Sequence, residues 1–319
     1  MISLKDVKDG RERISDIAYV TPILQSRQLS EICGNQMFLK SEHLQKTGSF
    51  KIRGASNKII HAIENGAKFV TAASSGNHGQ AVAYVAKKYG VPATIVVPEN
   101  VSKCKVNAIQ TYGGKVEMCG TTSGERIPRA QAIANQENGV YIPPYDDPLI
   151  MAGQGTIGLE ILEQVDNVDV IIVPIGGGGL ISGILTAIKE TNPKIKVIGV
   201  EPELANDTYL SLQSKKITTI PVSQTIADGL RTNQPGDLTF PVLMKYLDDI
   251  VLVSEDEIRQ SFSFVMERTK QLIETSAAVT IAAAMFNKLN IQGKNIATVI
   301  SGGNVDLDKV HQFIVNSEK

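Results

Sequence analysis

The sequence predicts an α/β protein built on parallel β-sheets. Short apolar runs rich in Val and Ile alternate along the chain with amphipathic stretches that end in glycine. That alternation is typical of buried parallel strands joined by crossover helices. At 319 residues the chain also exceeds the usual size of a single hydrophobic core, which predicts two domains or lobes.

The clearest strand and helix alternation lies between about residues 68 and 146. Strands are expected at 68–73, 93–97 and 115–119, and the helices between them at 77–89 and 102–112. Gly90 and Gly113 directly follow the two helices, as helix-ending glycines do. The block ends at Pro143-Pro144-Tyr145-Asp146-Asp147-Pro148, where the prolines exclude a continuous helix. We therefore place a domain boundary at about residue 147.

Beyond this boundary the same alternation continues. A strand rich in Val and Ile is expected at 169–175, and four glycines and a helix at 180–190 follow it at once. Further buried strands are expected at 196–200 and 295–301, and covering helices at 255–273 and 277–289. The junction of strand and glycine run is the first candidate for a ligand site.

Composition and charge exclude several classes of protein. A hydrophobic content of 42% without an apolar run of about twenty residues argues against a membrane span. A net charge of -1 without a basic stripe argues against binding to nucleic acid or to a membrane surface. Cys33, Cys104 and Cys119 are odd in number and lack C-x-x-C spacing, so neither disulfides nor a zinc site are expected. The acidic, interrupted N-terminus is unlike a secretory signal, and we expect a cytosolic protein with a small ligand.

The glycine run Gly176-Gly177-Gly178-Gly179 predicts a phosphate-binding loop. Glycines between a strand and a helix let several backbone N–H groups converge on an anion at the positive end of the helix. A flexible turn without a ligand is the plain alternative, and nucleotide loops use the same chemistry. However, no Lys-Ser or Lys-Thr pair follows as in a P-loop, and Ile181 stands where a dinucleotide motif has its third glycine.

Four segments together resemble a known family. They are Ser49-Phe50-Lys51-Ile52-Arg53-Gly54, Ser74-Ser75-Gly76-Asn77-His78, the glycine run, and Ser301-Gly302-Gly303-Asn304. In this order they resemble the fold-type II pyridoxal-phosphate enzymes, which are similar to the tryptophan synthase β subunit. Within them the chain looks most like eukaryotic-type serine racemases and the related serine and threonine dehydratases, from about residue 20 to about residue 306.

The resemblance implies a fold and a domain arrangement. Two open, twisted, mostly parallel sheets flanked by helices are expected. Residues 1–67 and 147–319 would form a discontinuous large domain that binds the cofactor, and residues 68–146 a small flexible domain. Ligands are then expected between the two.

The resemblance also assigns the groups that hold pyridoxal phosphate. Lys51 would bind the cofactor aldehyde covalently and act as the first acid/base group, although a lysine taken alone is usually solvated. Gly229, after Asp228, would shield the cofactor, although the pair could be a simple turn. The other implied contacts are Phe50 beside the ring, Asn77 at the phenolic oxygen, Ser301 at the pyridine nitrogen, and Leu180 closing the phosphate loop of Gly176, Gly177, Gly178 and Gly179. A neutral hydroxyl at the nitrogen weakens the electron sink.

Ser75 is the residue that distinguishes racemases from dehydratases in this resemblance. Dehydratases commonly carry alanine here, whereas the racemases carry serine on the ring face opposite the lysine. Inversion at Cα needs proton donors and acceptors on both faces of a planar centre, and Lys51 with Ser75 would supply them. Either Ser74 or Ser75 could instead cap the helix near Asn77, and we expect Ser74 to be scaffolding.

Two further sites are implied by resemblance. Glu201, Ala205 and Asp207 match the E-P-x-x-A-x-D metal loop of racemases and offer hard oxygen ligands for Mg²⁺, Ca²⁺ or Mn²⁺. Acidic loops after strands are also common without a metal. Positions that bind ATP as an activator at the dimer interface of animal serine racemases correspond to Ser26, Lys46, Thr47, Gln80 and Tyr112. Tyr145 departs from that pattern, and Thr275 after Glu274 replaces a usual proline, which predicts a looser turn.

The function implied is that of a cytosolic, homodimeric enzyme. It would interconvert L-serine and D-serine and also eliminate water from serine to give pyruvate and ammonia. Dehydration of threonine, serine or hydroxyaspartate without racemisation is the nearest alternative. A non-catalytic metabolite sensor that keeps the fold is another, because a fold alone does not establish an activity.

Overall fold

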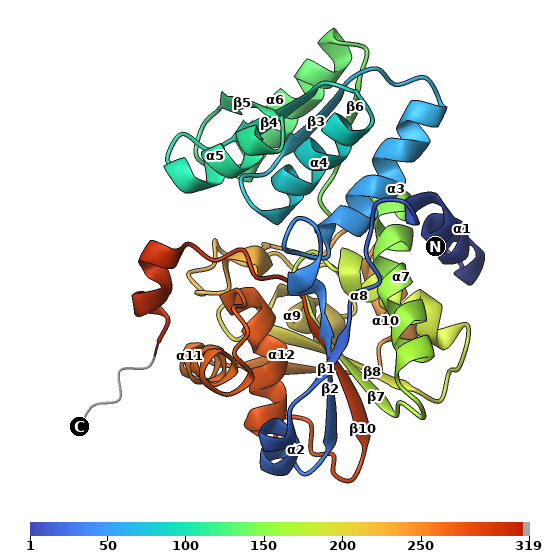
Figure 1. Cartoon of the computed structure of the whole chain (residues 1–319), viewed down its shortest axis with the longest axis vertical. Helices are drawn as coiled ribbons and strands as arrows, with labels where there is room; N and C mark the ends of the chain where they lie inside the picture. The colour runs from blue at the N-terminus through green and yellow to red at the C-terminus, as the bar shows by residue number, and fades with distance from the viewer. Residues whose placement is uncertain (315–319) are drawn as a thin grey trace.

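The computed structural model describes residues 1–314, which form two β-sheets with helices packed around them (Figure 1). The larger sheet has six strands in the order β1-β2-β10-β7-β8-β9, and the smaller has four in the order β5-β4-β3-β6. Neighbouring strands are parallel, except that β1 (Ile23–Gln25) runs antiparallel to β2 (Gln36–Ser41). The predicted α/β class with two mostly parallel sheets is therefore confirmed.

The smaller sheet and its helices follow the predicted alternation closely. Its strands are β3 (Val70–Ala73), β4 (Ala93–Val97), β5 (Lys115–Met118) and β6 (Val140–Tyr141). Its helices are α4 (Asn77–Lys88), α5 (Lys103–Thr111) and α6 (Ser123–Gln136). Because the strands are parallel, their carboxyl ends lie at one edge of this sheet.

The larger sheet is completed by β7 (Val170–Pro174), β8 (Lys196–Pro202), β9 (Asp249–Val253) and β10 (Asn295–Ile300). The other elements are α1 (Leu4–Ile14), α2 (Arg27–Cys33), η1 (Glu42–Leu44), α3 (Lys51–Glu64), α7 (Pro148–Gln164), α8 (Gly179–Lys189), α9 (Asp207–Ser214), η2 (Asp228–Leu230), α10 (Phe240–Tyr246), α11 (Glu255–Phe264), η3 (Val265–Thr269), α12 (Thr275–Met285) and η4 (Leu307–Gln312). No helix within residues 1–314 is long and apolar enough to cross a membrane.

The helix expected at 255–273 is shorter in the structure. The α-helix α11 ends at Phe264, and a π-helical turn, η3, follows it. The turn stops at Lys270, whose φ of 58° is left-handed and cannot continue a right-handed helix. The next helix accordingly begins at Thr275, two residues before the predicted start, and ends at Met285.

Hydrophobic side chains cover both faces of each sheet, although the cluster between the small sheet and α6 is small. Successive residues of β7 point to opposite faces, so Ile172 packs in the core with α12 whereas Ile171 packs in the core with α8. Ile52 and Ile59 of α3 belong to the core of the small sheet. Gly54 of the same helix faces α7, where an added Cβ would lie 2.8 Å from the Ile150 carbonyl oxygen. Helix α3 thus packs against both halves, and a boundary at residue 147 stays a prediction.

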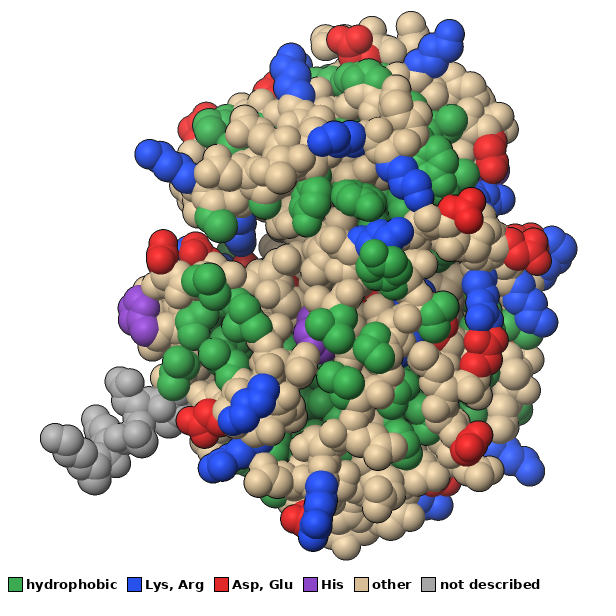
Figure 2. All heavy atoms as spheres, viewed as in Figure 1, with side chains coloured by type: hydrophobic (Ala, Val, Ile, Leu, Met, Phe, Trp, Pro, Cys, Tyr) green, Lys and Arg blue, Asp and Glu red, His purple; other side chains and the backbone are tan. Residues whose placement is uncertain are grey.

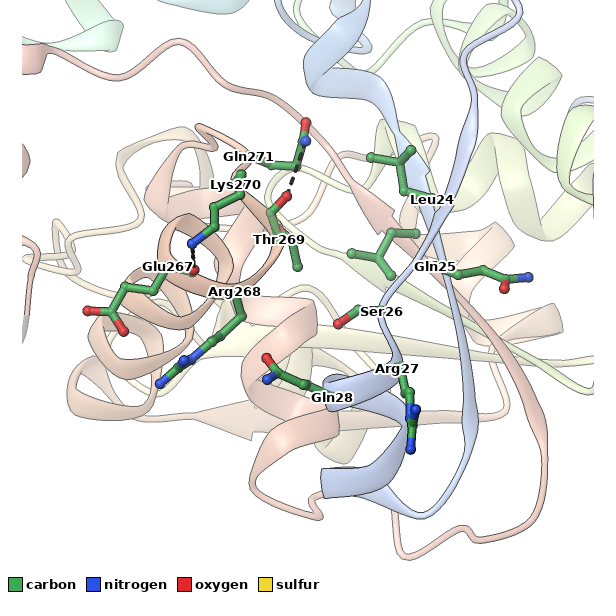
Figure 3. Close-up of a pocket in the computed structure, with 11 residues that line it drawn as sticks. Leu24, Gln25, Ser26, Arg27, Gln28, Glu267, Arg268, Thr269, Lys270 and Gln271 are labelled. Carbon is green, nitrogen blue, oxygen red and sulfur yellow. Dashed lines mark hydrogen bonds between the residues drawn. The ribbon is translucent and has the colours of Figure 1, made fainter.

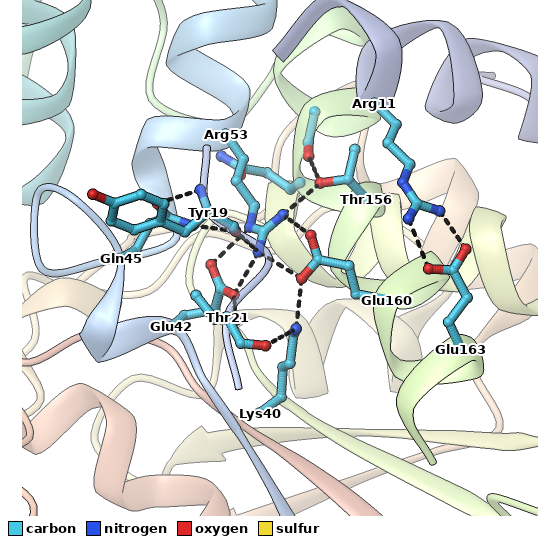
Figure 4. A network of polar contacts seen from close by, with 12 residues as sticks. Arg11, Tyr19, Thr21, Lys40, Glu42, Gln45, Arg53, Thr156, Glu160 and Glu163 are labelled. Atoms are coloured by element: carbon cyan, nitrogen blue, oxygen red, sulfur yellow. Dashed lines mark hydrogen bonds and ion pairs between the residues drawn. The ribbon is translucent and has the colours of Figure 1, made fainter. Parts of the chain in front are cut away.

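Four buried charges hold the first turn of α3 in place (Figure 4). Arg53 is 1% exposed and pairs with Glu42, from Nε to Oε2 at 2.8 Å, and with Glu160, from Nη1 to Oε1 at 2.6 Å. Lys40 Nζ lies 2.5 Å from Glu160 Oε2. We call these four residues the buried ionic cluster. It joins η1, β2, α3 and α7 directly behind Lys51.

Candidate active site

A cavity of about 550 Å³ lies between the two sheets. It is bordered by the segments that follow β3, β7 and β10, because the carboxyl ends of parallel strands open toward it. All the residues predicted to be catalytic or to hold the cofactor line this one cavity: Phe50, Lys51, Ser75, Asn77, Gly176, Gly177, Gly178, Gly179, Leu180, Gly229 and Ser301. The structure therefore brings together segments that are far apart in the sequence.

Lys51 is the first residue of α3, and its amine is buried in the cavity wall. Its Nζ donates a hydrogen bond of 2.8 Å to the carbonyl oxygen of Pro144 and lies 5.1 Å from the centre of the Phe50 ring. Among the described residues, no carboxylate forms an ion pair with it. Burial lowers the pKa of Lys51 to about 8, with Glu274 opposing the shift. A neutral amine is available near physiological pH to attack an aldehyde.

The glycine run forms the turn between β7 and α8. Gly178 precedes α8 with a left-handed φ of 89°, and no side chain caps the helix. An added Cβ would lie 2.4 Å from the Tyr145 ring at Gly177 and 2.7 Å from Thr239 Oγ1 at Gly178. Only glycine fits these two positions. The first N–H groups of α8 border the cavity and suit a phosphate.

The loop after β3 presents Ser75 and Asn77 to the cavity. Gly76 is the N-cap of α4, and no side chain caps the helix. Ser75 therefore does not cap α4, which was its alternative role. Ser74 Oγ accepts from the Gly76 N–H at 3.3 Å, in agreement with a scaffolding role. His78 is buried against the Ile142 carbonyl oxygen at 2.8 Å. Burial, together with the charge of Lys51, lowers the pKa of His78 to about 3 and keeps it neutral.

Asn77 lies in a hydrogen-bonded group with Glu274 and Asn304. Its Nδ2 donates to Glu274 Oε1 and Oε2 at 3.0 and 2.9 Å, and its Oδ1 accepts from Asn304 Nδ2 at 2.8 Å. Burial raises the pKa of Glu274 to about 7. Glu274 was not predicted as a cavity residue, because only the missing proline after it stood out in the sequence.

The segment after Glu274 is anchored by hydroxyl groups. Thr275 Oγ1 donates to the Ile226 carbonyl oxygen at 2.7 Å, and Ser276 Oγ accepts from the Gly229 N–H at 2.9 Å. These bonds tie the start of α12 to the segment that carries Gly229. The looser turn expected from the loss of proline is thus offset by side-chain hydrogen bonds.

Ser301 follows β10 on the floor of the cavity. Its carbonyl oxygen accepts from the Phe50 N–H at 3.0 Å, which connects β10 to the segment that carries Lys51. Together, the buried amine, the uncapped helix start, and the Asn77 and Ser301 side chains fit the aldehyde, phosphate, phenolic oxygen and ring nitrogen of pyridoxal phosphate. The chemistry of the donor set therefore agrees with that cofactor.

Two cations in the cavity wall were missed by the sequence analysis. Arg126 Nη2 donates to Ser123 Oγ at 3.2 Å, but Nε and Nη1 are buried without a partner among the described residues. Lys105 Nζ lies 3.1 Å from Asp228 Oδ2, which joins α5 to η2. Lys105 follows β4 and Arg126 follows β5 in the sequence. A position after the carboxyl end of a parallel strand was the sequence signal that could have identified both as cavity residues.

The proposed metal ligands form a separate buried pair. Glu201 in β8 accepts from the N–H groups of Thr208 and Tyr209 at 3.1 and 2.8 Å, and Asp207 begins α9. Burial, then the charge of Asp207, raises the pKa of Glu201 to about 8, and burial raises the pKa of Asp207 to about 7. Ala205 is buried beside them. Within residues 1–314 no group of three or more His, Cys, Asp or Glu side chains could hold a metal, so this set would depend on the Ala205 carbonyl oxygen and water.

The residues matched to a nucleotide site are dispersed in the single chain. Gln80 lines the main cavity, whereas Ser26 lines a second cavity of about 540 Å³ with Arg268 and Lys270 (Figure 3). Lys46 Nζ lies 4.5 Å from the centre of the Tyr19 ring. The remaining two, Thr47 and Tyr112, are respectively buried and packed edge-to-face on Tyr84. Tyr145 lies in the wall of the main cavity, against the glycine run.

The chain is similar to known proteins over almost its whole length. The family described as pyridoxal-phosphate dependent enzyme matches residues 14–302. The chain is 44% identical to the L-threonine ammonia-lyase of Thermotoga maritima, over 98% of this chain and 78% of the relative. It is 43% identical to the serine racemase of Dictyostelium discoideum, over 98% of each chain. The structure of maize serine racemase superposes with a TM-score of 0.93 at 38% identity, covering 98% of this chain and 96% of that one. The chain therefore belongs to the pyridoxal-phosphate dependent enzymes of the serine racemase and serine/threonine dehydratase family.

Proposed function

We propose that this protein is a cytosolic serine racemase that interconverts L-serine and D-serine and also eliminates water from serine to give pyruvate and ammonia. The observation that carries the proposal is that Lys51, with its lowered pKa, and Ser75 line the same cavity. Pyridoxal phosphate, when bound, supplies the electron-withdrawing ring that makes the Cα–H bond acidic. The chain supplies the proton acceptors and donors.

Each proposed role is assigned to a side chain that lines the cavity. Lys51 takes or returns the Cα proton on one face, because its amine becomes neutral near pH 8. Ser75 does the same on the other face. Ser301 would hold the ring nitrogen through its hydroxyl, and a neutral partner there would leave that nitrogen largely unprotonated and favour rapid reprotonation at Cα. The N–H groups at the uncapped start of α4 would bind the substrate carboxylate.

The first experiment separates racemisation from elimination. Chiral chromatography of the products from L-serine should reveal D-serine alongside pyruvate. Keto acid without D-serine would instead favour a serine or threonine ammonia-lyase, a class to which relatives of similar identity belong. Ser75→Ala should reduce racemisation more than elimination of L-serine, because elimination needs a base on one face only. Equal losses would contradict the two-face assignment.

A second candidate, hydroxyaspartate dehydration, is favoured by Arg126. A half-buried guanidinium whose Nε and Nη1 are buried without partners among the described residues suits a carboxylate, and a dicarboxylic substrate would bring a second carboxylate. Arg126→Met should lower kcat/KM for 3-hydroxyaspartate by about 10-fold or more and leave serine within about 3-fold if the residue meets the distal carboxylate. Equal losses for both substrates would assign Arg126 to the carboxylate that all amino acids share.

The metal site is proposed as structural. Two adjacent buried carboxylates are stabilised in their charged form by a divalent cation, so Mg²⁺ should raise the unfolding temperature of the protein. Asp207→Asn should abolish that increase. If Mg²⁺, Ca²⁺ and Mn²⁺ all leave the unfolding temperature of the wild type unchanged, the proposed metal site is wrong.

We also propose a homodimer that binds ATP, and calorimetry tests the binding. Hydrophobic side chains gather near the middle of the face drawn in Figure 2, in the region where Figure 1 draws β1. Exposed apolar residues near that strand in the sequence are Tyr19, Val20, Ile32 and Leu44. A surface of this kind suits a second copy of the chain. A monomeric mass by light scattering would contradict the homodimer.

The non-catalytic sensor has its own test. If the protein turns over none of a panel of amino acids, the sensor is favoured over the enzyme.

A further inference from the structure

We propose that Pro144, Tyr145 and Asp146 form a clamp that fixes the glycine run relative to Lys51, with Asp146 as its positioning residue. This inference rests on the proposed binding of pyridoxal phosphate. The cofactor must be held at its aldehyde and at its phosphate together, and the two holding groups belong to distant parts of the chain. The clamp, as defined by these three residues, contacts both.

At one end the clamp holds Lys51. The carbonyl oxygen of Pro144 accepts the hydrogen bond from Lys51 Nζ at 2.8 Å. Tyr145 follows and packs closely against the glycine run. A Cβ added at Gly177 would lie 2.4 Å from the Tyr145 ring, and a Cβ added at Gly179 would lie 2.8 Å from the Cβ of Tyr145. Consecutive residues of one rigid, proline-containing segment thus contact the reactive amine and the candidate phosphate loop.

At the other end Asp146 holds the turn of residues 236–239. Its Oδ1 accepts from the N–H groups of Leu238 at 2.8 Å and Thr239 at 3.2 Å, and its Oδ2 accepts from the N–H of Asp237 at 3.1 Å. An added Cβ at Gly236 would lie 2.2 Å from Oδ1. One carboxylate therefore fixes the conformation of the whole turn.

The turn of residues 236–239 then fixes a peptide group of the glycine run. Thr239 Oγ1 donates to the Gly177 carbonyl oxygen at 2.8 Å, and the Gly236 N–H reaches the same oxygen at 3.3 Å. In a trans peptide the C=O and the next N–H point in opposite directions. Holding the Gly177 oxygen on the side of the turn therefore directs the Gly178 N–H to the other side, and Gly178 borders the cavity.

Asp146 acts only through other groups in this scheme. All three of its hydrogen bonds go to the turn, so its negative charge is satisfied there. Its loss should release the Gly177 peptide and weaken the interaction with phosphate. The interaction of Lys51 with the aldehyde should be affected much less, because Pro144 contacts Lys51 through its backbone.

The experiment compares the dissociation constants of pyridoxal phosphate and pyridoxal, measured on the cofactor-free protein by the absorbance of the bound compound. Pyridoxal carries the same aldehyde and ring but no phosphate. Asp146→Ala should weaken binding of pyridoxal phosphate by about 10-fold to 100-fold, as expected for hydrogen bonds to a charged group, and pyridoxal by less than about 3-fold. Asp146→Asn, which keeps the shape and one oxygen acceptor, should lie between Ala and wild type and guards against a folding defect.

Two further variants test the route. Asp147→Asn is the matched control, because Asp147 caps α7 and pairs with Lys58 but has no bond to the turn. Its ratio of the two dissociation constants should equal that of the wild type. Thr239→Val should reproduce the selective loss, and the double variant with Asp146→Ala should lose no more than the larger single change, because both act on the Gly177 oxygen.

The outcomes separate the clamp from the proposed function. If the Asp146 substitutions weaken the binding of both compounds equally, or of neither, the clamp is wrong while cofactor binding stands. If the effects of Asp146→Ala and Thr239→Val multiply, Asp146 does not act through the turn. If the wild type binds neither compound, the proposed function itself fails.

Discussion

Two sets of buried charges lie at the two ends of one short segment, residues 51–53. Behind it, the buried ionic cluster pairs two cations with two carboxylates (Figure 4). In front of it, Lys51 faces the cavity with only a carbonyl oxygen as its hydrogen-bond partner, among the described residues. The cluster residues are almost fully buried and Lys51 is half-buried, but the larger difference lies in the partners. A compensated charge holds the fold, whereas an uncompensated one is available for a ligand.

The pKa values of Arg53 and Glu42 differ from those of the cavity groups in the same way. Burial acts to lower the pKa of Arg53, but Glu42 and Glu160 raise it above its usual range. Burial acts to raise the pKa of Glu42, but Arg53 lowers it. In the cavity no such partner opposes burial effectively, so the pKa of Lys51 falls to about 8 and that of Glu274 rises to about 7. Arg53 and Glu42 therefore stay charged at neutral pH, whereas burial lowers the pKa of Lys40 despite its pair with Glu160. The cavity groups lie close to their titration points.

Removing the cavity amine should produce the largest effect on activity. Lys51→Ala should lower turnover of serine by about 10⁴-fold, because both the covalent attachment and the first acid/base group are lost. The unfolding temperature of the cofactor-free protein should not fall, since the buried amine has no charged partner to leave behind. Product assays measure the loss of turnover, and thermal unfolding of the same preparation measures the stability. A strongly destabilised variant would place Lys51 with the structural charges.

Breaking the buried ionic cluster should act in the opposite way. Glu160→Gln leaves Arg53 and Lys40 short of one negative charge, and we expect a loss of about 3–5 kcal/mol in the free energy of unfolding. The matched control is Glu163→Gln in the same helix. Glu163 is 52% exposed in its pair with Arg11, so its loss should cost less than about 1 kcal/mol. Urea unfolding curves of the two variants decide, and equal midpoints would contradict the comparison.

The titration of Lys51 gives a third prediction. Only the neutral amine attacks an aldehyde, so the rate at which cofactor-free protein captures pyridoxal phosphate should rise with pH and level off above a midpoint of about 8. An ordinary lysine would continue to gain rate up to about pH 10.4. Stopped-flow absorbance across pH 6 to 10 measures the midpoint. A midpoint near the ordinary value would mean that the amine is solvated when the aldehyde arrives.

Sequence patterns were sufficient for the parts that depend on local or family-specific signals. The strand and helix alternation predicts β3, β4, β5, β7, β8 and β10, whereas the division into two sheets was implied by the family resemblance. The motifs around Lys51, Ser75 and the glycine run predict residues that meet in one cavity. The early end of α11 was missed because the left-handed conformation of Lys270 follows from tertiary packing rather than from its residue type. Arg126 and Asp146 were missed as site residues because their roles depend on what lies opposite them in space. Asp146 bonds to the turn of residues 236–239, and Arg126 borders a cavity that is built from segments far apart in the sequence.

The smallest expected effect tests how the cavity wall is held without proline. Thr275 begins α12, its N–H has no partner within the helix, and Glu274 before it is extended, with φ -87° and ψ 158°. Both features suit proline at position 275. Thr275→Pro should change the free energy of unfolding by less than about 1 kcal/mol, because the reduced freedom of the unfolded chain offsets the lost bond to Ile226. Thr275→Val removes the bond without that gain and should be the less stable of the two in urea. If valine is tolerated as well as proline, the hydroxyl does not anchor the wall.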